Sequence, residues 1–303
     1  MEKIGVAFTL FGKDIYWYGI IIAIGLVLGV WVAVELIKRK GYKGETILDA
    51  AIICVPMAII FSRIYYVIFA PAGAFTWEQW WRVFFVWEGG LAIYGAVIGG
   101  VLGLFIFSKW RKVPLLDLLD VAAVGVILGQ AIGRWGNFAN QEAFGTAVTN
   151  PAMQWFPLSV YIERSHTVFD VVSGQNIICT NPWHFATFFY ESIWSIGVFL
   201  FLFLWYSKRA KSRGNVFFMY LLLYGIGRTA IEWLRTDSLW IVNGAWQPPL
   251  DVLLRVSWLL SILLVITSTV ILSIRAKKPI GFLTVPEKYA RVGKKTEEQK
   301  KEE

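Results

Sequence analysis

Long apolar runs alternate with short polar connections along most of the chain. Seven runs are each about 20 residues long, the length that an α-helix needs to cross the hydrocarbon core of a bilayer. They cover residues 15–37, 47–69, 90–108, 114–134, 184–206, 215–234 and 252–274. The runs are continuous and do not alternate in polarity, which argues against an outer-membrane barrel. The pattern therefore predicts an all-α polytopic membrane protein with seven transmembrane helices.

Composition favours the same fold class. Of the 303 residues, 57% are hydrophobic and only 17% are charged, which is far from a soluble average. The chain has 16 tryptophans, a residue type that favours the boundary between water and hydrocarbon. The formal net charge of +8 comes from short basic clusters between apolar runs, so it indicates topology, and we expect no nucleic-acid partner. Cys54 and Cys179 suggest neither a disulfide framework nor a thiolate metal site.

Basic clusters follow the first, third, fifth and seventh runs, at residues 38–43, 109–112, 208–213 and 275–278. The positive-inside rule then predicts an N-terminus outside and a C-terminus in the cytoplasm. We expect one membrane domain over residues 1–284, with a small external segment at 145–183 between the fourth and fifth helices. The aromatic stretch 71–89 is expected to re-enter the outer interface, and residues 285–303 to form a charged cytoplasmic tail.

This orientation gives each polar residue a depth, and the polar residues converge on the outer half of the membrane. In the sixth run, steps of 4, 4 and 3 residues place one stripe on a helix: Tyr224, Arg228, Glu232 and Arg235. An arginine at the centre of a membrane helix costs roughly 2.5–3.5 kcal/mol, so the stripe must face protein or water. An ion pair between Arg228 and Glu232 that only holds the helices together is one explanation, and a polar cavity is another.

The stretch GRWGNFANQEAFG, residues 133–145, concentrates polar side chains at the end of the fourth run. Its polar residues include Arg134, Asn137, Asn140 and Glu142. Gly133 and Gly136 permit close approach of a ligand or a neighbouring helix. By itself, Arg134 could be a snorkelling interfacial anchor. Together with the arginines of the sixth run, it predicts a site for a phosphate-bearing ligand, which in a membrane is a phospholipid.

These residues resemble the signature of the prolipoprotein diacylglyceryl transferase family, Gly-Arg-x-Gly-Asn-Phe-x-Asn-x-Glu-x-x-Gly, at each fixed position. The similarity extends through IYWYG, SRIYYV, WEGGLAIYGAVIGG, HFATFFYES and YGIGRTAIEWLRTD. It implies a seven-helix enzyme of the bacterial cytoplasmic membrane whose site opens toward the outer leaflet. Its activity would be transfer of the diacylglyceryl group from phosphatidylglycerol to the lipobox cysteine of a preprolipoprotein signal peptide. Glycerol phosphate would be released, and no cofactor is implied.

The resemblance also assigns candidate residues by position. Arg134 would bind the phosphatidylglycerol headgroup, with Asn137, Glu142 and Gly145 shaping that site. The expected substrate-binding residues are Arg134, Asn137, Asn140, Gly145, Tyr18, Arg63, Glu191 and Tyr224. The expected catalytic residues are Arg134, Arg228, Glu232, Glu142 and Tyr94. Members of the family often carry histidine where this chain has Tyr94, and glutamine where it has Trp258.

The reaction requires a thiolate and a stabilised phosphate leaving group. A free thiol has a pKa near 8.5, so arginines at the site would favour its ionisation and also neutralise the departing phosphate. An unperturbed tyrosine, with a pKa near 10, is a poor base, so we expect Tyr94 to position substrate. Either Glu142 or Glu232 could accept the thiol proton. No metal is expected, because the sequence has no HExxH helix and no CxxC pair.

Three other functions stay open at this point. A phospholipid transporter would place polar groups near the midplane, whereas here they fall in one half. An intramembrane protease would need a pair such as Asp117 and Asp120, which lie at the inner end of the fourth run and are more easily explained as partners of Lys112 or of lipid headgroups. A structural lipid-binding protein would hold phospholipid without modifying a peptide.

Overall fold

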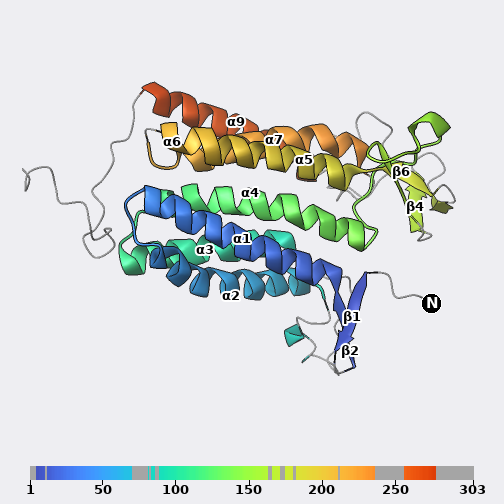
Figure 1. The fold of residues 1–303 in the computed structure, drawn as a ribbon, viewed down its shortest axis with the longest axis horizontal. Helices are drawn as coiled ribbons and strands as arrows, with labels where there is room; N and C mark the ends of the chain where they lie inside the picture. Colours follow the sequence, from blue (N-terminus) through green and yellow to red (C-terminus); the bar gives the residue numbers. More distant parts are fainter. Residues whose placement is uncertain are drawn as a thin grey trace, which may run out of the picture. The chain divides into compact units, whose positions relative to one another are not determined.

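The computed structural model describes residues 5–10, 12–69, 81, 83–85, 89–162, 166–170, 175–179, 182–210, 212–235 and 256–277. Contacts divide the described residues into two compact units. Unit 1 contains residues 5–29 and 123–277, and unit 2 contains residues 30–122. The boundaries fall inside two long helices, α1 (Trp17–Arg39) and α4 (Leu115–Ala139) (Figure 1).

Six helical stretches in the described part of the chain are long and apolar enough to cross a membrane. They are α1, α2 (Glu45–Ile68), α3 (Ile93–Arg111), α4, the continuous stretch Thr187–Arg209 and α9 (Val256–Lys277). Thr187–Arg209 consists of α5 (Thr187–Leu200), the π-helix η4 (Phe201–Tyr206) and α6 (Ser207–Arg209). The prediction of a mostly helical, polytopic membrane protein is therefore confirmed.

The sixth predicted run is shorter than expected. Its helix, α7 (Asn215–Ile231), has 17 residues and continues into the 3-10 turn η5 (Glu232–Leu234). Arg235 then adopts an extended conformation and forms an isolated β-bridge with Gly145. The helical stripe predicted from Tyr224 to Arg235 holds as far as Glu232, whose N–H still donates to the carbonyl oxygen of Arg228, and is wrong at Arg235, because this backbone pairing draws the chain out of the helix. Since α7 is not among the six long helices, the count of seven spans stays a prediction.

Glycines allow neighbouring helices to approach closely within each unit. In unit 1, Gly25 and Gly29 of α1 face Gly129 and Gly125 of α4. A Cβ atom on Gly29 would stand only 2.7 Å from the carbonyl oxygen of Gly125. In unit 2, α3 presents a series of glycines to α2, namely Gly95, Gly99 and Gly103. The four-residue spacing keeps each series on one helical face, as is common where membrane helices pack.

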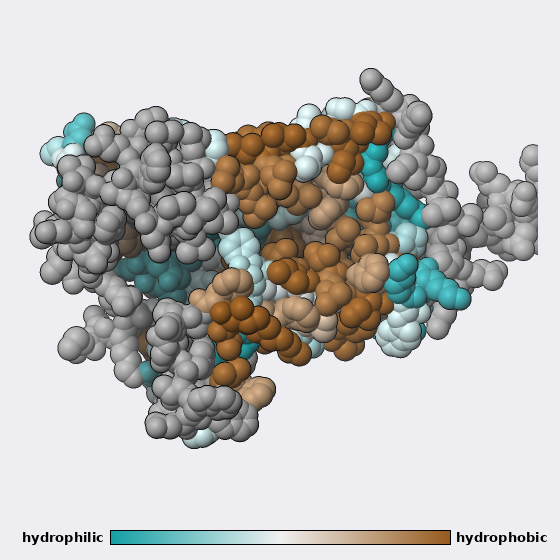
Figure 2. Space-filling view, turned by 180° about the vertical axis from the view of Figure 1, so that it is seen from behind, coloured by the Kyte–Doolittle hydropathy of each residue, from teal (hydrophilic) through white to brown (hydrophobic). Residues whose placement is uncertain are grey.

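Large apolar side chains cover the outer surface of the helices. Ile52, Ile68 and Ile93 are between 68% and 73% exposed. Figure 2 shows such side chains in brown over much of one face of the described residues, with the hydrophilic ones in teal mostly at the edges of that area. An apolar surface of this extent is unfavourable in water and is typical of helices that contact lipid.

Small β elements precede α1 and connect α4 to α5. The sequence pattern does not predict the first hairpin, in which β1 (Val6–Leu10) pairs with β2 (Lys13–Tyr16). In the predicted external segment 145–183, β4 (His166–Asp170) pairs with β5 (Gln175–Cys179), and β3 (Ser159–Tyr161) pairs with β6 (Trp183–Phe185), which extends two residues beyond that segment. A small apolar core lies beside β3 and β6 and contains Val160, Ile162, Ala186 and Phe188.

Two predicted segments fall mainly outside the described residues. Of the aromatic stretch 71–89, the structure describes only residues 81, 83–85 and 89. The tail 285–303 lies outside them completely. The re-entry, the cytoplasmic tail and the single membrane domain over residues 1–284 therefore stay predictions.

Candidate functional site

Glu191, in the second turn of α5, is the centre of an ion-pair cluster within unit 1. Its carboxylate pairs with Arg134 of α4, with Arg228 of α7 at 3.3 Å and with Arg235 at 2.9 Å. Glu232 supplies a second carboxylate, whose Oε2 lies 2.8 Å from Nη2 of Arg228. The side chain of Arg134 is 23% exposed and that of Glu232 is 0% exposed. Among the described residues, three guanidinium groups of this cluster share two carboxylates, an excess of one positive charge.

Hydrogen bonds between α4 and α5 hold Arg134 and Glu191 close to each other. The hydroxyl of Ser192, the residue after Glu191, donates to the carbonyl oxygen of Ala131 at 2.9 Å. It also accepts a hydrogen bond from the indole Nε1 of Trp135 at 3.2 Å. Since Trp135 follows Arg134 directly, these two bonds fix α5 against α4 at the level of the ion pairs. The bridge between Gly145 and Arg235 brings the end of η5 to the same region.

Arg134 also connects the ion-pair cluster to a group of amides at the end of α4. Its Nη1 donates to Oδ1 of Asn137 at 3.4 Å. The amides of Asn137 and Asn140 donate to Oε1 of Glu142 at 3.2 Å and 3.3 Å. Glu142 is exposed, whereas Glu232 is fully buried. The site therefore has a buried arginine-rich part and an accessible carboxylate next to it.

Two glycines of the 133–145 stretch have a clear packing role. A Cβ atom on Gly136 would stand 2.7 Å from Cδ2 of Tyr18, so the Tyr18 ring lies directly against this turn of α4. A Cβ atom on Gly145 would stand 2.8 Å from the carbonyl oxygen of Leu234. Gly145 is buried and allows the two chain segments to pair. Its predicted contact with substrate stays a prediction.

Tyr224 belongs to an aromatic and polar series on α7. Its ring stacks on that of Tyr220, with 5.9 Å between centroids. The hydroxyl of Tyr220 donates to Oε1 of Gln130 on α4 at 3.3 Å. Tyr224 lies one helical turn before Arg228, so the structure brings it to the same side of α7 as the ion-pair cluster.

Two predicted site residues, Arg63 and Tyr94, belong to unit 2. Arg63 is buried, and its guanidinium donates to the carbonyl oxygens of Val83 and Gly89, each at 2.7 Å. The ring of Tyr94, in the first turn of α3, lies 6.0 Å from that of Tyr65. Arg63 thus holds the segment that leads into α3. Substrate binding by Arg63 and a catalytic role for Tyr94 stay predictions.

One residue that contacts the cluster, Ser257, is not among the predicted site residues. The hydroxyl of Ser257, at the start of α9, donates to Oε1 of Glu232 at 2.7 Å. No local pattern marks this serine, because its partner lies 25 positions away in the sequence. The neighbouring Trp258 has a buried indole Nε1 that forms no hydrogen bond with the described residues.

Asp117 and Asp120, the pair that a protease would need, are engaged in another network in unit 2. The Nζ atom of Lys40 lies 2.9 Å from Asp117 and 2.7 Å from Asp120. The hydroxyl of Tyr42 donates to the second oxygen of Asp117 at 2.8 Å. The predicted partner Lys112 is therefore replaced by Lys40, because the loop after α1 lies against the start of α4. These contacts explain the two aspartates as a structural link.

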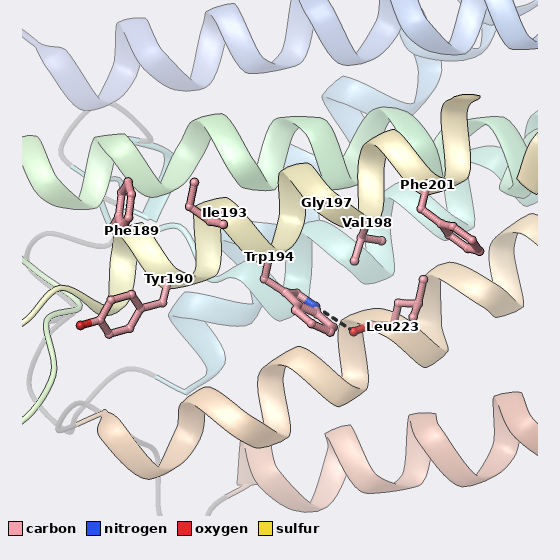
Figure 3. A pocket seen from close by; sticks show the side chains of 8 residues that line it. All are labelled: Phe189, Tyr190, Ile193, Trp194, Gly197, Val198, Phe201 and Leu223. Carbon is pink, nitrogen blue, oxygen red and sulfur yellow. Dashed lines mark hydrogen bonds between the residues drawn. The ribbon is translucent and has the colours of Figure 1, made fainter. Parts of the chain in front are cut away.

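An apolar pocket of about 570 Å³ lies along α5 in unit 1 (Figure 3). Its lining comes from α5, η4 and α7 and consists of Phe189, Tyr190, Ile193, Trp194, Gly197, Val198, Phe201 and Leu223. The indole of Trp194 donates to the carbonyl oxygen of Leu223 at 3.0 Å, the dashed line in Figure 3. The Tyr190 hydroxyl donates to the carbonyl oxygen of Leu158. With these polar groups paired, the pocket presents mainly hydrocarbon.

Fold and site together define a polytopic membrane protein with an arginine-rich cluster of ion pairs. A sequence model of the family described as prolipoprotein diacylglyceryl transferase matches residues 5–274. The chain therefore belongs to the prolipoprotein diacylglyceryl transferase family, as the resemblance predicted.

Relatives named phosphatidylglycerol–prolipoprotein diacylglyceryl transferase agree with this family membership. The protein of Oceanobacillus iheyensis is 41% identical over 284 residues, which cover 94% of this chain and 90% of the relative. That of Enterococcus faecalis is 39% identical over 279 residues, or 90% of this chain and 91% of the relative. That of Clostridioides difficile is 42% identical over 234 residues, which cover 77% of this chain and 84% of the relative.

Proposed function

We propose that this protein transfers the diacylglyceryl group of phosphatidylglycerol to the lipobox cysteine of a preprolipoprotein, forming a thioether and releasing glycerol phosphate. Family membership and the names of the relatives support this activity. The structural observation that carries it is the Glu191 cluster, with its one excess positive charge. A phosphodiester headgroup bears one negative charge and would balance that excess, and guanidinium groups suit its oxygens.

We further propose a topology of seven spans, with α7 and η5 forming the sixth, an N-terminus outside and a C-terminus in the cytoplasm. Basic residues in the last turns of α1 and α3 support this orientation through the positive-inside rule. In this orientation Arg134, Glu191 and Arg228 belong to the outer half of the bilayer. The site would then face the outer leaflet of a bacterial cytoplasmic membrane, which contains the lipid substrate.

In the proposed reaction, the thiol loses its proton and sulfur attacks the glyceryl carbon that bears the phosphate. The C–S bond forms as the C–O bond breaks, and glycerol phosphate leaves with the electron pair of that bond. The charge on the phosphate group therefore grows from one negative charge toward two. Arg134 and Arg228 would stabilise this increase, because preorganised donors that face a developing anion lower the barrier.

For the thiol proton, we propose Glu142 as the acceptor instead of Glu232. Glu232 is fully buried, and its two oxygens already interact with Arg228 and Ser257. Glu142 is exposed, and the two amides that donate to it would fix the orientation of its carboxylate. Substrate contacts are proposed for Asn137, Asn140, Gly145, Tyr18, Arg63, Glu191 and Tyr224, and a positioning role for Tyr94.

The direct test is to incubate the purified protein with phosphatidylglycerol and a lipobox peptide and to search by mass spectrometry for a diacylglyceryl group on the cysteine. Arg134→Gln should lower kcat/KM by about 100-fold, the effect of losing one preorganised charged donor group. Arg111→Gln is the matched control, because Arg111 pairs with Asp49 at 2.9 Å in unit 2 and should keep wild-type transfer. Lipid movement without an adduct would instead favour a transporter.

A pH series tests the proton acceptor. Glu142→Gln should transfer slowly at pH 7, and its deficit should shrink toward pH 9, because a thiol with a pKa near 8.5 then ionises without a base. Glu232→Gln should lose activity by a similar factor at every pH, since its role is to hold Arg228. A Glu142→Gln deficit that stays constant with pH would contradict the assignment of Glu142 as the base.

A further inference from the structure

Ser257 links α9 to the buried end of the ion-pair cluster. Its hydroxyl donates to Oε1 of Glu232 at 2.7 Å, while Oε2 of the same carboxylate lies 2.8 Å from Arg228. The two helices are closely packed nearby, since a Cβ atom on Gly225 of α7 would stand 2.9 Å from the carbonyl oxygen of Ser261 on α9. The position of Ser257 relative to Glu232 is therefore set by close helix packing.

We propose that Ser257 is a positioning residue for the diacylglyceryl transfer, which acts by fixing the carboxylate of Glu232 and, through it, the guanidinium of Arg228. This role rests on the proposed function. In the proposed role, Ser257 itself contacts neither Arg228 nor the lipid. Its effect on the reaction passes through one carboxylate.

The geometry of Arg228 makes it dependent on Glu232. Its Nη1 donates to Oε1 of Glu191 at 3.3 Å, while its Nη2 lies closer, 2.8 Å from Oε2 of Glu232, in an ion pair without hydrogen-bond geometry. Glu232 has a 0% exposed side chain, so water does not replace a lost partner at Oε1. Without the serine hydroxyl, the carboxylate would lose one of the contacts that fix its orientation. The 2.8 Å ion pair between Glu232 and Arg228 would then lengthen.

The hydroxyl of Ser257 differs from other hydroxyls on α9 in what it binds. Ser261, Thr267 and Thr269 each donate to a carbonyl oxygen four residues earlier in their own helix. That is the usual way in which serine and threonine are accommodated in membrane helices. Ser257 instead donates to the carboxylate of Glu232 on another element, and Glu232 is itself a member of the ion-pair cluster.

The test compares Ser257→Ala with two reference variants in the adduct assay. Ser257→Ala should lower kcat/KM for phosphatidylglycerol by about tenfold, the effect of losing one hydrogen bond to a charged group. The loss should appear in both KM and kcat, because Arg228 meets one negative charge on the bound lipid and a larger one in the transition state. Ser257→Thr keeps the hydroxyl and should retain most activity. Ser261→Ala removes a buried hydroxyl one turn away and should stay within about twofold of wild type.

A double-mutant cycle separates positioning from general packing. If Ser257 acts through Glu232, Ser257→Ala should cause no further loss in a Glu232→Gln background. Additive losses would overturn the proposal, and so would an equal loss in Ser261→Ala. If the wild-type protein forms no adduct, the proposed function is wrong. The role of Ser257 is then tested by measuring how much phosphatidylglycerol each variant retains. In native mass spectrometry, Ser257→Ala should retain less phosphatidylglycerol than Ser261→Ala, and equal retention would overturn the positioning role.

Discussion

Glu191→Gln is the substitution that most directly tests the electrostatic account of the cluster. The glutamine has nearly the same shape, and its carbonyl oxygen can still accept a hydrogen bond, but it has no charge. Glu191 contacts Arg134, Arg228 and Arg235, so the substitution leaves three guanidinium groups with Glu232 as their remaining carboxylate within the cluster. The excess of one positive charge becomes an excess of two.

The size of the effect follows from the contacts and their burial. Hydrogen bonds between charged groups are worth about 1.5–3 kcal/mol and roughly twice as much as neutral ones, so three weakened bonds amount to about 2–4 kcal/mol. Breaking a buried ion pair by removing one charge typically costs about 3–5 kcal/mol, in the same range. For a chain of this size we expect the melting temperature to fall by roughly 6–12 °C.

Thermal unfolding in detergent, followed by tryptophan fluorescence, measures this shift. Glu35→Gln is the matched control, because Glu35 pairs with Lys38 at 2.7 Å but both side chains are more than one-third exposed. That variant should melt within about 2 °C of wild type, since exposed ion pairs contribute about 0–1 kcal/mol. If both variants melt at the wild-type temperature, the ion pairs of the cluster do not stabilise unit 1.

Two further substitutions test packing. Gly29→Val should lower stability by about 1–3 kcal/mol, because its side chain would collide with the backbone of Gly125, while Gly19→Val on the same helix faces open space and should be nearly neutral. Equal melting temperatures for the two valine variants would refute the close contact. Trp258→Phe removes a buried indole donor that has no partner among the described residues, and it should leave stability unchanged or raise it by about 1 kcal/mol. A clear drop in its melting temperature would show that the indole N–H has a partner.

Hydropathy alone predicts where the helices lie, but not where each begins and ends. α3 begins at Ile93, three residues later than expected, because Gly89 and Gly90 have φ values of 87° and 70°, which an α-helix does not allow. α4 continues to Ala139, five residues beyond the predicted end. The polar residues there do not break the helix, because their side chains bind one another within its last turns and just beyond its end.

The candidate site was predictable where it depends on local spacing. Arg228 and Glu232 are four residues apart and form the ion pair that this spacing predicts. The central position of Glu191 was not predictable, because its partners come from three other segments of the chain. The Ser257 contact and the bridge between Gly145 and Arg235 are likewise long-range, and helical periodicity carries no information about them.

The link between Lys40 and the two aspartates of α4 has a consequence for biogenesis. Lys40 is among the cations that orient α1 in the topology proposed above, yet in the folded chain it lies within 2.9 Å of both Asp117 and Asp120. α4 is synthesised some 75 residues after α1, so these partners do not yet exist when α1 enters the membrane. In that topology Lys40 would act as an orienting charge during this interval and would become a structural ion-pair partner only when α4 arrives.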